Sequence, residues 1–197
     1  MKNKTIQCEP QHTAVVTIDI QKDYFPGGRF PLWRARHALK QTRLLLSWAR
    51  QRGLPIIHIQ HFTLRPGARF LQDGTPGTAL HPGLEIRAGE LVIAKHFPNS
   101  FRETNLEQSL RDRGITTVIW AGMISWMCVD TTVRAAFDLG FINILIHDAT
   151  ASGPLLRNVG GLPGILWPWR LQSAFMAALG AFHARVIGLR DLLRLAD

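Results

Sequence analysis

The stretch TTVIWAGMISWMCVDTTVRAAFDLGFINILIH at residues 116–147 decides the fold. It begins with the strand-like run TTVIWAG (116–122), continues as a helix over about Trp126–Leu139, and closes with the apolar run FINILIH (141–147). Apolar runs of this length are typical of strands covered on both faces, and a helix between two of them is typical of a parallel βαβ unit. The stretch therefore predicts a parallel sheet with helices packed against it.

The same alternation extends over the rest of the chain. Further strands are expected at AVVTIDI (14–20), PIIHIQH (55–61), LVIAK (91–95) and ARVIGL (184–189), and further helices near 34–52, 103–113 and 171–183. A Gly/Pro-rich loop is expected from about Leu64 to Gly89. This pattern predicts an α/β fold, a three-layer doubly wound (Rossmann-like) and mostly parallel sheet of about six strands flanked by helices. Residues 1–197 contain no linker and no internal repeat, so we expect one domain.

Charge and composition narrow the class of partner. The formal net charge of +9 raises nucleic acid as a partner, but the densest basic stretch, Arg34–Arg52, alternates with apolar residues like one solvated helix face. We therefore predict no nucleic-acid partner. No run reaches the roughly 18 apolar residues that a membrane helix needs, and the polar segment 1–12 does not resemble a secretory signal. These features predict a cytoplasmic protein with no membrane partner.

The chain has two cysteines, Cys8 and Cys128, and neither stands at the spacing of a disulfide framework or a zinc site. Cys128 lies in the expected first turn of the helix that follows strand 116–122. A helix amino terminus lowers the pKa of a thiol and favours the thiolate, which fits a nucleophile. The alternative is a small buried hydrophobic residue.

Two charged residues stand at the ends of other expected strands. Asp19 lies near the end of strand 14–20, and Lys95 closes strand 91–95. A buried charge is costly unless it is paired, and doubly wound sheets bind ligands at the carboxyl ends of their strands. Alone, each residue could be a cap or an ordinary ion pair, but together with Cys128 they predict one reactive site. Asp23 is expected to be a solvated loop residue.

The motifs around these residues resemble those of the isochorismatase-like cysteine hydrolases. A D-x-Q motif stands at Asp19-Ile20-Gln21, a lysine precedes an N-S-F pattern in KHFPNSF (95–101), and a G-x-x-x-x-x-C-V-x-x-T-x-R block begins at Gly122. The resemblance covers about residues 12–150 and resumes at 174–186. It implies a catalytic triad of Asp19, Lys95 and Cys128.

The resemblance also implies a reaction. The Cys128 thiolate would attack a carbonyl carbon and cleave a C–N bond in an amide, carbamoyl or ureido group of a small molecule, through a thioester. A cis peptide between Met123 and Ile124 would turn the Ile124 N–H toward the substrate, where it would form the oxyanion hole with the Cys128 N–H. Two alternatives stay open. One is hydrolysis of the vinyl ether of isochorismate, whose hydrolases generally lack the cysteine, and the other is non-catalytic binding on the same fold.

Four side chains near the motifs are candidates for substrate contacts: Gln21, Phe25, Phe97 and Trp126. The nicotinamidase branch of the superfamily binds a metal through an Asp-x-His pattern and further histidines after its second strand. That pattern is missing here, and His58 and His61 point to opposite faces of a strand. We therefore predict no metal and no cofactor, and we interpret these histidines as structural or substrate-lining.

One segment departs from the family pattern. Residues 152–170, SGPLLRNVGGLPGILWPWR, are rich in Gly, Pro and large apolar residues where the family usually has a polar, acidic stretch. So much apolar surface should be buried, either in a subunit interface or as a lid over the pocket. We favour the interface and expect a homodimer or homotetramer.

Overall fold

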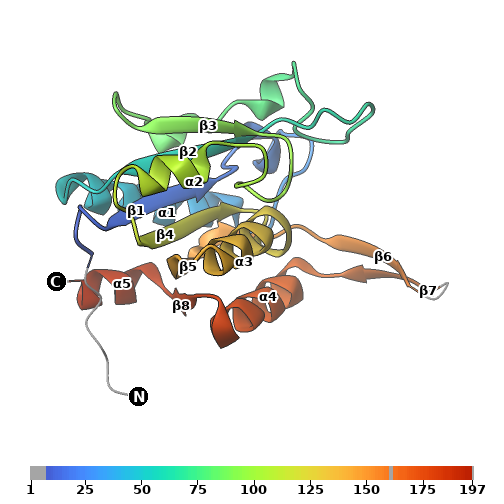
Figure 1. Ribbon diagram of the computed structural model, residues 1–197. Helices are drawn as coiled ribbons and strands as arrows, with labels where there is room; N and C mark the ends of the chain where they lie inside the picture. Colours follow the sequence, from blue (N-terminus) through green and yellow to red (C-terminus); the bar gives the residue numbers. More distant parts are fainter. Residues whose placement is uncertain (1–7, 160–161, 197) are drawn as a thin grey trace.

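The central feature of the computed structural model, which describes residues 8–159 and 162–196, is one parallel sheet (Figure 1). Its strand order is β3-β2-β1-β4-β5-β8, and every neighbouring pair is parallel. The strands are β1 (Thr13–Ile18), β2 (Ile56–His61), β3 (Leu91–Lys95), β4 (Thr117–Met123), β5 (Ile142–Ala151) and β8 (Arg185–Ile187). The predicted doubly wound sheet of six strands is confirmed.

Helices cover both faces of this sheet. The first face carries α1 (Ala35–Gln51) and α5 (Leu189–Leu195), and the second carries α2 (Leu106–Arg111), α3 (Asp130–Asp138) and α4 (Pro168–Phe182). Successive residues of β1 alternate between the two cores, since Val15 packs with α1 while Ala14 and Val16 pack with α2 and α3. Burial on both faces explains why the strands read as continuous apolar runs. None of the helices in the described residues is long and apolar enough to span a bilayer.

The site lies where the winding of the sheet reverses. The chain proceeds outward from β1 to β2 and β3, then returns to place β4 on the other side of β1. The carboxyl ends of β1 and β4 are therefore the switch point at which such sheets bind ligands. Gly122, near the end of β4, has φ +137°, and a Cβ atom there would lie 2.2 Å from the Ile18 carbonyl oxygen. Only glycine allows the two strands to approach this closely.

The loop after β1 is fixed by a buried carboxylate. Asp23 lies in the 3-10 helix η1 (Lys22–Tyr24) and accepts the backbone N–H of Leu71 at 2.7 Å and of Arg29 at 3.2 Å. The expectation that Asp23 is solvated is wrong, because two distant loop segments close over it. Gly77, in the 3-10 helix η2 (Pro76–Thr78), leaves room for this carboxylate, since a Cβ there would lie 2.0 Å from Asp23 Oδ1.

A second buried polar network ties the opposite edge of the sheet to α1. His58 on β2 contacts Thr17 Oγ1 through Nδ1 at 2.7 Å and Glu90 Oε2 through Nε2 at 3.1 Å. Glu90 also binds Arg50 Nε on α1 at 2.7 Å. Burial raises the pKa of Glu90, but hydrogen bonds from Arg50, from the Arg87 backbone and from His58 outweigh it and lower this pKa to about 2. His58 is thus structural, one of the two roles expected for it.

Residues 152–170 differ most from the sequence prediction. β5 extends to Ala151, and the chain then forms an antiparallel hairpin of β6 (Leu155–Val159) and β7 (Leu162–Leu166) that projects away from the sheet (Figure 1). We call residues 152–170 the hairpin arm. Its exposed apolar side chains include Leu156 and Ile165, and the rings of Trp167 and Trp169 stack at 5.3 Å. A role in a subunit interface stays a prediction.

Candidate active site

Four side chains meet at the carboxyl edge of the sheet. Asp19 follows β1, His61 and Lys95 are the last residues of β2 and β3 and are paired in register, and Cys128 follows β4. One donor atom each of Asp19, His61 and Cys128 lie within 4.8 Å of one another. We call these four residues the strand-end cluster. The structure thus brings together the three predicted triad residues and adds a histidine.

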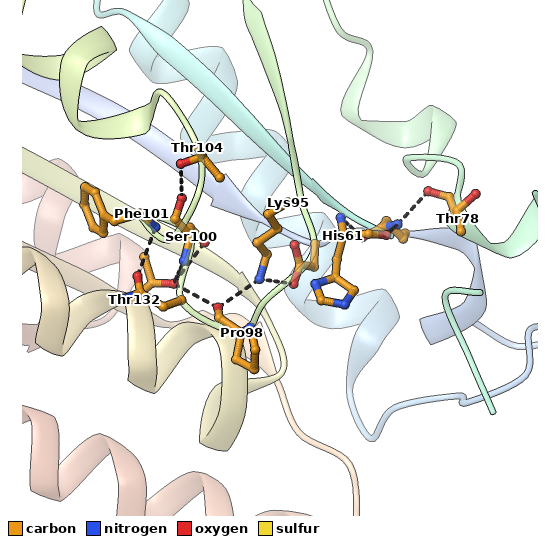
Figure 2. A network of polar contacts seen from close by, with 11 residues as sticks. His61, Thr78, Lys95, Pro98, Ser100, Phe101, Thr104 and Thr132 are labelled. Atoms are coloured by element: carbon orange, nitrogen blue, oxygen red, sulfur yellow. Dashed lines mark hydrogen bonds and ion pairs between the residues drawn. The ribbon is translucent and has the colours of Figure 1, made fainter. Parts of the chain in front are cut away.

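A buried ion pair forms the centre of the cluster. Lys95 Nζ lies 2.9 Å from Asp19 Oδ2, and neither side chain is exposed to solvent. Lys95 also donates to the Pro98 carbonyl at 3.0 Å (Figure 2). Burial lowers the pKa of Lys95, but the charge of Asp19 and the proximity of Cys128 outweigh it, so the pKa is raised above its ordinary value. Lys95 is therefore a fixed cation at neutral pH.

Cys128 lies beside this ion pair and is buried. Burial raises the pKa of its thiol to about 12, the charge of Asp19 adds to the increase, and Lys95 opposes it. The expectation that a helix start lowers this pKa is therefore wrong. Two features explain the difference. Burial dominates, and Cys128 lies in a π-helical turn (Ser125–Val129) before α3 rather than in the first turn of α3 itself. The resting thiol is protonated and needs a proton acceptor.

The turn between β4 and Cys128 contains the expected cis peptide, between Met123 and Ile124. The Ile124 carbonyl accepts the backbone N–H of Met127 at 3.0 Å and of Val129 at 3.2 Å. These bonds close the turn that carries the thiol. The role of the Ile124 and Cys128 N–H groups as an oxyanion hole stays a prediction.

A hydroxyl network connects the lysine loop to the helix behind the cysteine. Thr132 on α3 donates to Ser100 Oγ at 2.9 Å and accepts the Ser100 backbone N–H at 3.0 Å (Figure 2). Ser100 belongs to the same loop as Pro98, whose carbonyl accepts from Lys95. The network thereby fixes the position of Lys95 relative to Cys128.

Gln21, a predicted substrate contact, binds the protein backbone. Its amide is fully buried and binds the backbone of His61 twice, accepting from the N–H and donating to the carbonyl, both at 2.8 Å. It also donates to the Thr78 carbonyl at 2.6 Å. The D-x-Q glutamine therefore holds the end of β2, and its contact with a substrate stays a prediction.

The three aromatic candidates for substrate contacts differ in environment. Phe25 is buried, with its ring 4.2 Å from that of His81, and Phe97 lies under the Arg102 guanidinium at 3.6 Å. Trp126 is half-buried, and its Nε1 donates to the Gly153 carbonyl at 2.9 Å. Trp126 thus attaches the base of the hairpin arm to the turn that carries Cys128. Their contacts with a substrate stay predictions.

Two further residues lie near the thiol: Tyr24, which was not assigned to the site from the sequence, and His61, which was expected to be structural or substrate-lining. Tyr24 is buried, and burial together with the charges of Cys128 and Asp19 raises its pKa well above the ordinary value. His61 is nine-tenths buried, and its Nδ1 atom has no hydrogen-bond partner among the residues that the structure describes. Burial lowers the pKa of His61, which makes it a neutral imidazole near pH 7. The odd spacing of His58 and His61 predicted that their side chains point to opposite faces of the strand. It did not indicate which of the two faces the thiol.

The cluster also offers a carboxylate, an imidazole and a thiol, a donor set that thiophilic metals accept. The Lys95 ammonium at 2.9 Å from Asp19 already supplies the positive charge that this carboxylate needs. A metal ion would have to bind against that fixed cation. We therefore assign no metal to the cluster, and the absence of a metal cofactor stays a prediction.

Comparison with known proteins gives a consistent result. Residues 13–158 match the family model of the isochorismatase domain. The chain is 37% identical over 174 residues to the uncharacterized isochorismatase family protein YddQ of Bacillus subtilis, covering 88% of this chain and 94% of YddQ. It is 35% identical to the ureidoacrylate amidohydrolase RutB of Methylorubrum extorquens, over 82% of this chain and 59% of RutB. The crystal structure of an isochorismatase from Pseudomonas putida KT2440 superposes with a TM-score of 0.84 at 32% identity, covering 95% and 93% of the two chains.

Proposed function

Since the chain belongs to the isochorismatase family of hydrolases, we propose that it is a cysteine-dependent hydrolase that cleaves a C–N bond of a small molecule through a thioester. The observation that carries this proposal is the buried pair of Asp19 and Lys95 with the Cys128 thiol beside it. An inert buried cysteine would need neither charge next to it. Burying two charges costs desolvation free energy, so their place beside the thiol points to a role in its chemistry. The name of the relative RutB, an amidohydrolase, supports the same bond class.

The first half-reaction follows from the positions of these groups. Asp19 Oδ1 is buried and has no hydrogen-bond partner among the described residues, so it is free to accept the thiol proton. As the proton moves, Sγ bonds to the carbonyl carbon and the carbonyl oxygen becomes an anion, which the N–H groups of Ile124 and Cys128 stabilise. The C–N bond then breaks, Asp19 returns the proton to the nitrogen, and the amine leaves. Lys95 keeps the total charge of the site low throughout.

The high pKa of the Cys128 thiol supports a role of Asp19 as its proton acceptor. A thiol with a pKa of about 12 provides almost no thiolate at neutral pH, so attack has to be coupled to proton transfer. A cysteine is also what an amide-cleaving branch requires, because the thioester stores the acyl group while the amine departs. These points favour C–N cleavage over vinyl-ether hydrolysis and over non-catalytic binding.

The test is turnover of a panel of small amides, carbamoyl compounds and ureido compounds by wild type, Cys128→Ala and the matched control Cys8→Ala. We expect hydrolysis by wild type and by Cys8→Ala, and loss of about 10³-fold or more in Cys128→Ala, as for removal of a nucleophile. Intact-mass analysis during turnover should find an acyl group on Cys128. Full turnover by Cys128→Ala would show that the reaction does not pass through this thiol and would contradict the proposal.

A further inference from the structure

The strand-end cluster holds one group that the first half-reaction leaves unused. His61 Nδ1 is buried, has no hydrogen-bond partner among the described residues, and belongs to a side chain within 4.8 Å of both the thiol and the Asp19 carboxylate. A buried nitrogen without a partner is costly unless a ligand or a water satisfies it. His61 Nδ1 is therefore available to a polar atom of a ligand or to a water.

Hydrogen bonds and strand register fix the position of the His61 backbone. The Gln21 amide makes two hydrogen bonds of 2.8 Å to the backbone of His61. The register of β2 with β3 places His61 opposite Lys95. Figure 2 shows His61 and Lys95 side by side at the ends of their strands. Such fixed placement is what a catalytic base needs, since small displacements of a reacting group are expensive.

The second half-reaction needs a proton acceptor for a water. After the amine has left, a water has to attack the thioester, and a base has to take its proton. Asp19 Oδ2 is paired with Lys95 at 2.9 Å, whereas His61 Nδ1 has no hydrogen-bond partner among the described residues. A neutral imidazole is a common general base for a water proton.

The distances suit a single bridging water. Two hydrogen bonds of about 2.8 Å can connect atoms up to roughly 5.6 Å apart, and one of the two ring nitrogens of His61 lies within 4.8 Å of Sγ. A water bound to His61 would therefore lie next to the carbonyl carbon attached to that sulfur. We propose that His61 is a further catalytic residue, the general base for the water that hydrolyses the Cys128 thioester. This inference rests on the proposed function.

The step balances as follows. The water oxygen bonds to the thioester carbon while one of its protons passes to His61 Nδ1. The C–S bond of the tetrahedral intermediate then breaks, and its electron pair goes to Sγ. The imidazolium returns the proton to Sγ, which leaves the free acid, a neutral His61 and the Cys128 thiol. The high pKa of that thiol favours the last transfer.

The experiment separates the two half-reactions with p-nitrophenyl acetate as the acylating probe. In wild type the release of p-nitrophenol reports acylation, and intact mass reports the acetyl group on Cys128. In His61→Asn, which keeps a polar atom near the Nδ1 position but has no base, we expect acylation within about threefold of wild type. Loss of the acetyl group should slow by about 100-fold or more, the usual contribution of general base catalysis, so acetylated enzyme accumulates. Added imidazole should speed deacetylation of His61→Ala, which a purely structural role would not allow.

The matched control is His96→Asn, because His96 is the exposed neighbour of Lys95 and should leave both steps unchanged. Thermal melts of each variant establish that it folds, and His61→Gln serves as the second variant if His61→Asn does not. Deacetylation at the wild-type rate in folded His61 variants would overturn the inference while leaving the nucleophile intact. Absence of acetyl-Cys128 even in wild type would overturn the proposed function, and this inference with it.

Discussion

The strand-end cluster and the hairpin arm are built in opposite ways. The cluster buries charged and polar side chains, whereas the hairpin arm exposes Leu156, Ile165, Trp167 and Trp169. In the cluster Asp19 and Lys95 depend on each other, because a buried charge without its partner is very costly. In the hairpin arm the large apolar side chains are exposed, and the two tryptophans stack on each other. The fold should therefore depend strongly on the cluster and weakly on the arm.

The largest expected effect is at the ion pair. Lys95→Met leaves the Asp19 carboxylate buried without its cation, so we expect a loss of about 3–5 kcal/mol in the free energy of unfolding together with loss of turnover. The double variant Asp19→Asn/Lys95→Met should recover part of the stability but none of the activity. Urea unfolding measures the stability of both variants, and an activity assay measures their turnover. The exposed Lys22→Met is the control. A loss below about 1 kcal/mol in Lys95→Met would contradict the strong coupling.

The buried network around Glu90 should make the stability of the protein depend on pH. The pKa of Glu90 is about 2 in the folded protein against an ordinary 4.5, so its contribution is complete above pH 4.5 and is lost as the pH falls toward 2. Solvent screens this partly buried carboxylate, so its contribution is smaller than the shift alone implies, about 1–2 kcal/mol. We expect Glu90→Gln to be less stable than wild type at pH 7 by about this amount, and the difference to shrink on acidification. Denaturant unfolding from pH 7 to 3 measures it, and a constant difference across this range would contradict the assignment.

A smaller effect is expected at Thr132. Thr132→Val removes the hydroxyl that binds Ser100 twice and leaves the buried Ser100 N–H without that acceptor, at a cost of about 1–2 kcal/mol. Because the Ser100 loop positions Lys95, turnover should fall more than substrate affinity. The neighbouring half-buried Thr131→Val is the control. Equal effects of the two variants on turnover would show that the network does not position the lysine.

The smallest effect on stability is expected in the hairpin arm. We propose that the arm contacts a second copy of the chain, so Trp167→Ser/Trp169→Ser should leave the unfolding free energy of the single chain within about 0.5 kcal/mol. It should instead weaken a homodimer or homotetramer, measured as molar mass by light scattering over a range of concentrations. Leu44→Ser, equally exposed on α1, should not change the mass. An unchanged oligomer, or a wild type that is monomeric throughout, would contradict this role of the arm.

The same contrast explains what could be read from the sequence. The sheet and the triad residues were predictable because buried strands give continuous apolar runs and because Asp19, Lys95 and Cys128 end or follow strands that the topology brings together. The hairpin arm was not predicted as strands, since its Gly- and Pro-rich sequence lacks a clear period.

Two local errors have a common physical origin. Asp23 was expected to be solvated and Cys128 to have a lowered pKa, yet both are buried and their neighbours come from distant loops or strands. Sequence position shows that a polar residue is near a strand end, but not how completely other segments enclose it. His61 was left open between two roles for the same reason.

The most direct test of the account is to measure the ionisation of Cys128 in a Cys8→Ala background. The readout is the rate of iodoacetamide labelling as a function of pH. For wild type we predict a thiol that ionises only at strongly alkaline pH, near the pKa of about 12. In Asp19→Asn the Lys95 ammonium would face the thiolate alone, so the apparent pKa should fall and labelling near neutral pH should accelerate, although turnover is lost. An ordinary thiol profile, with a pKa near 8.5 in both proteins, would contradict the coupling of Asp19, Lys95 and Cys128.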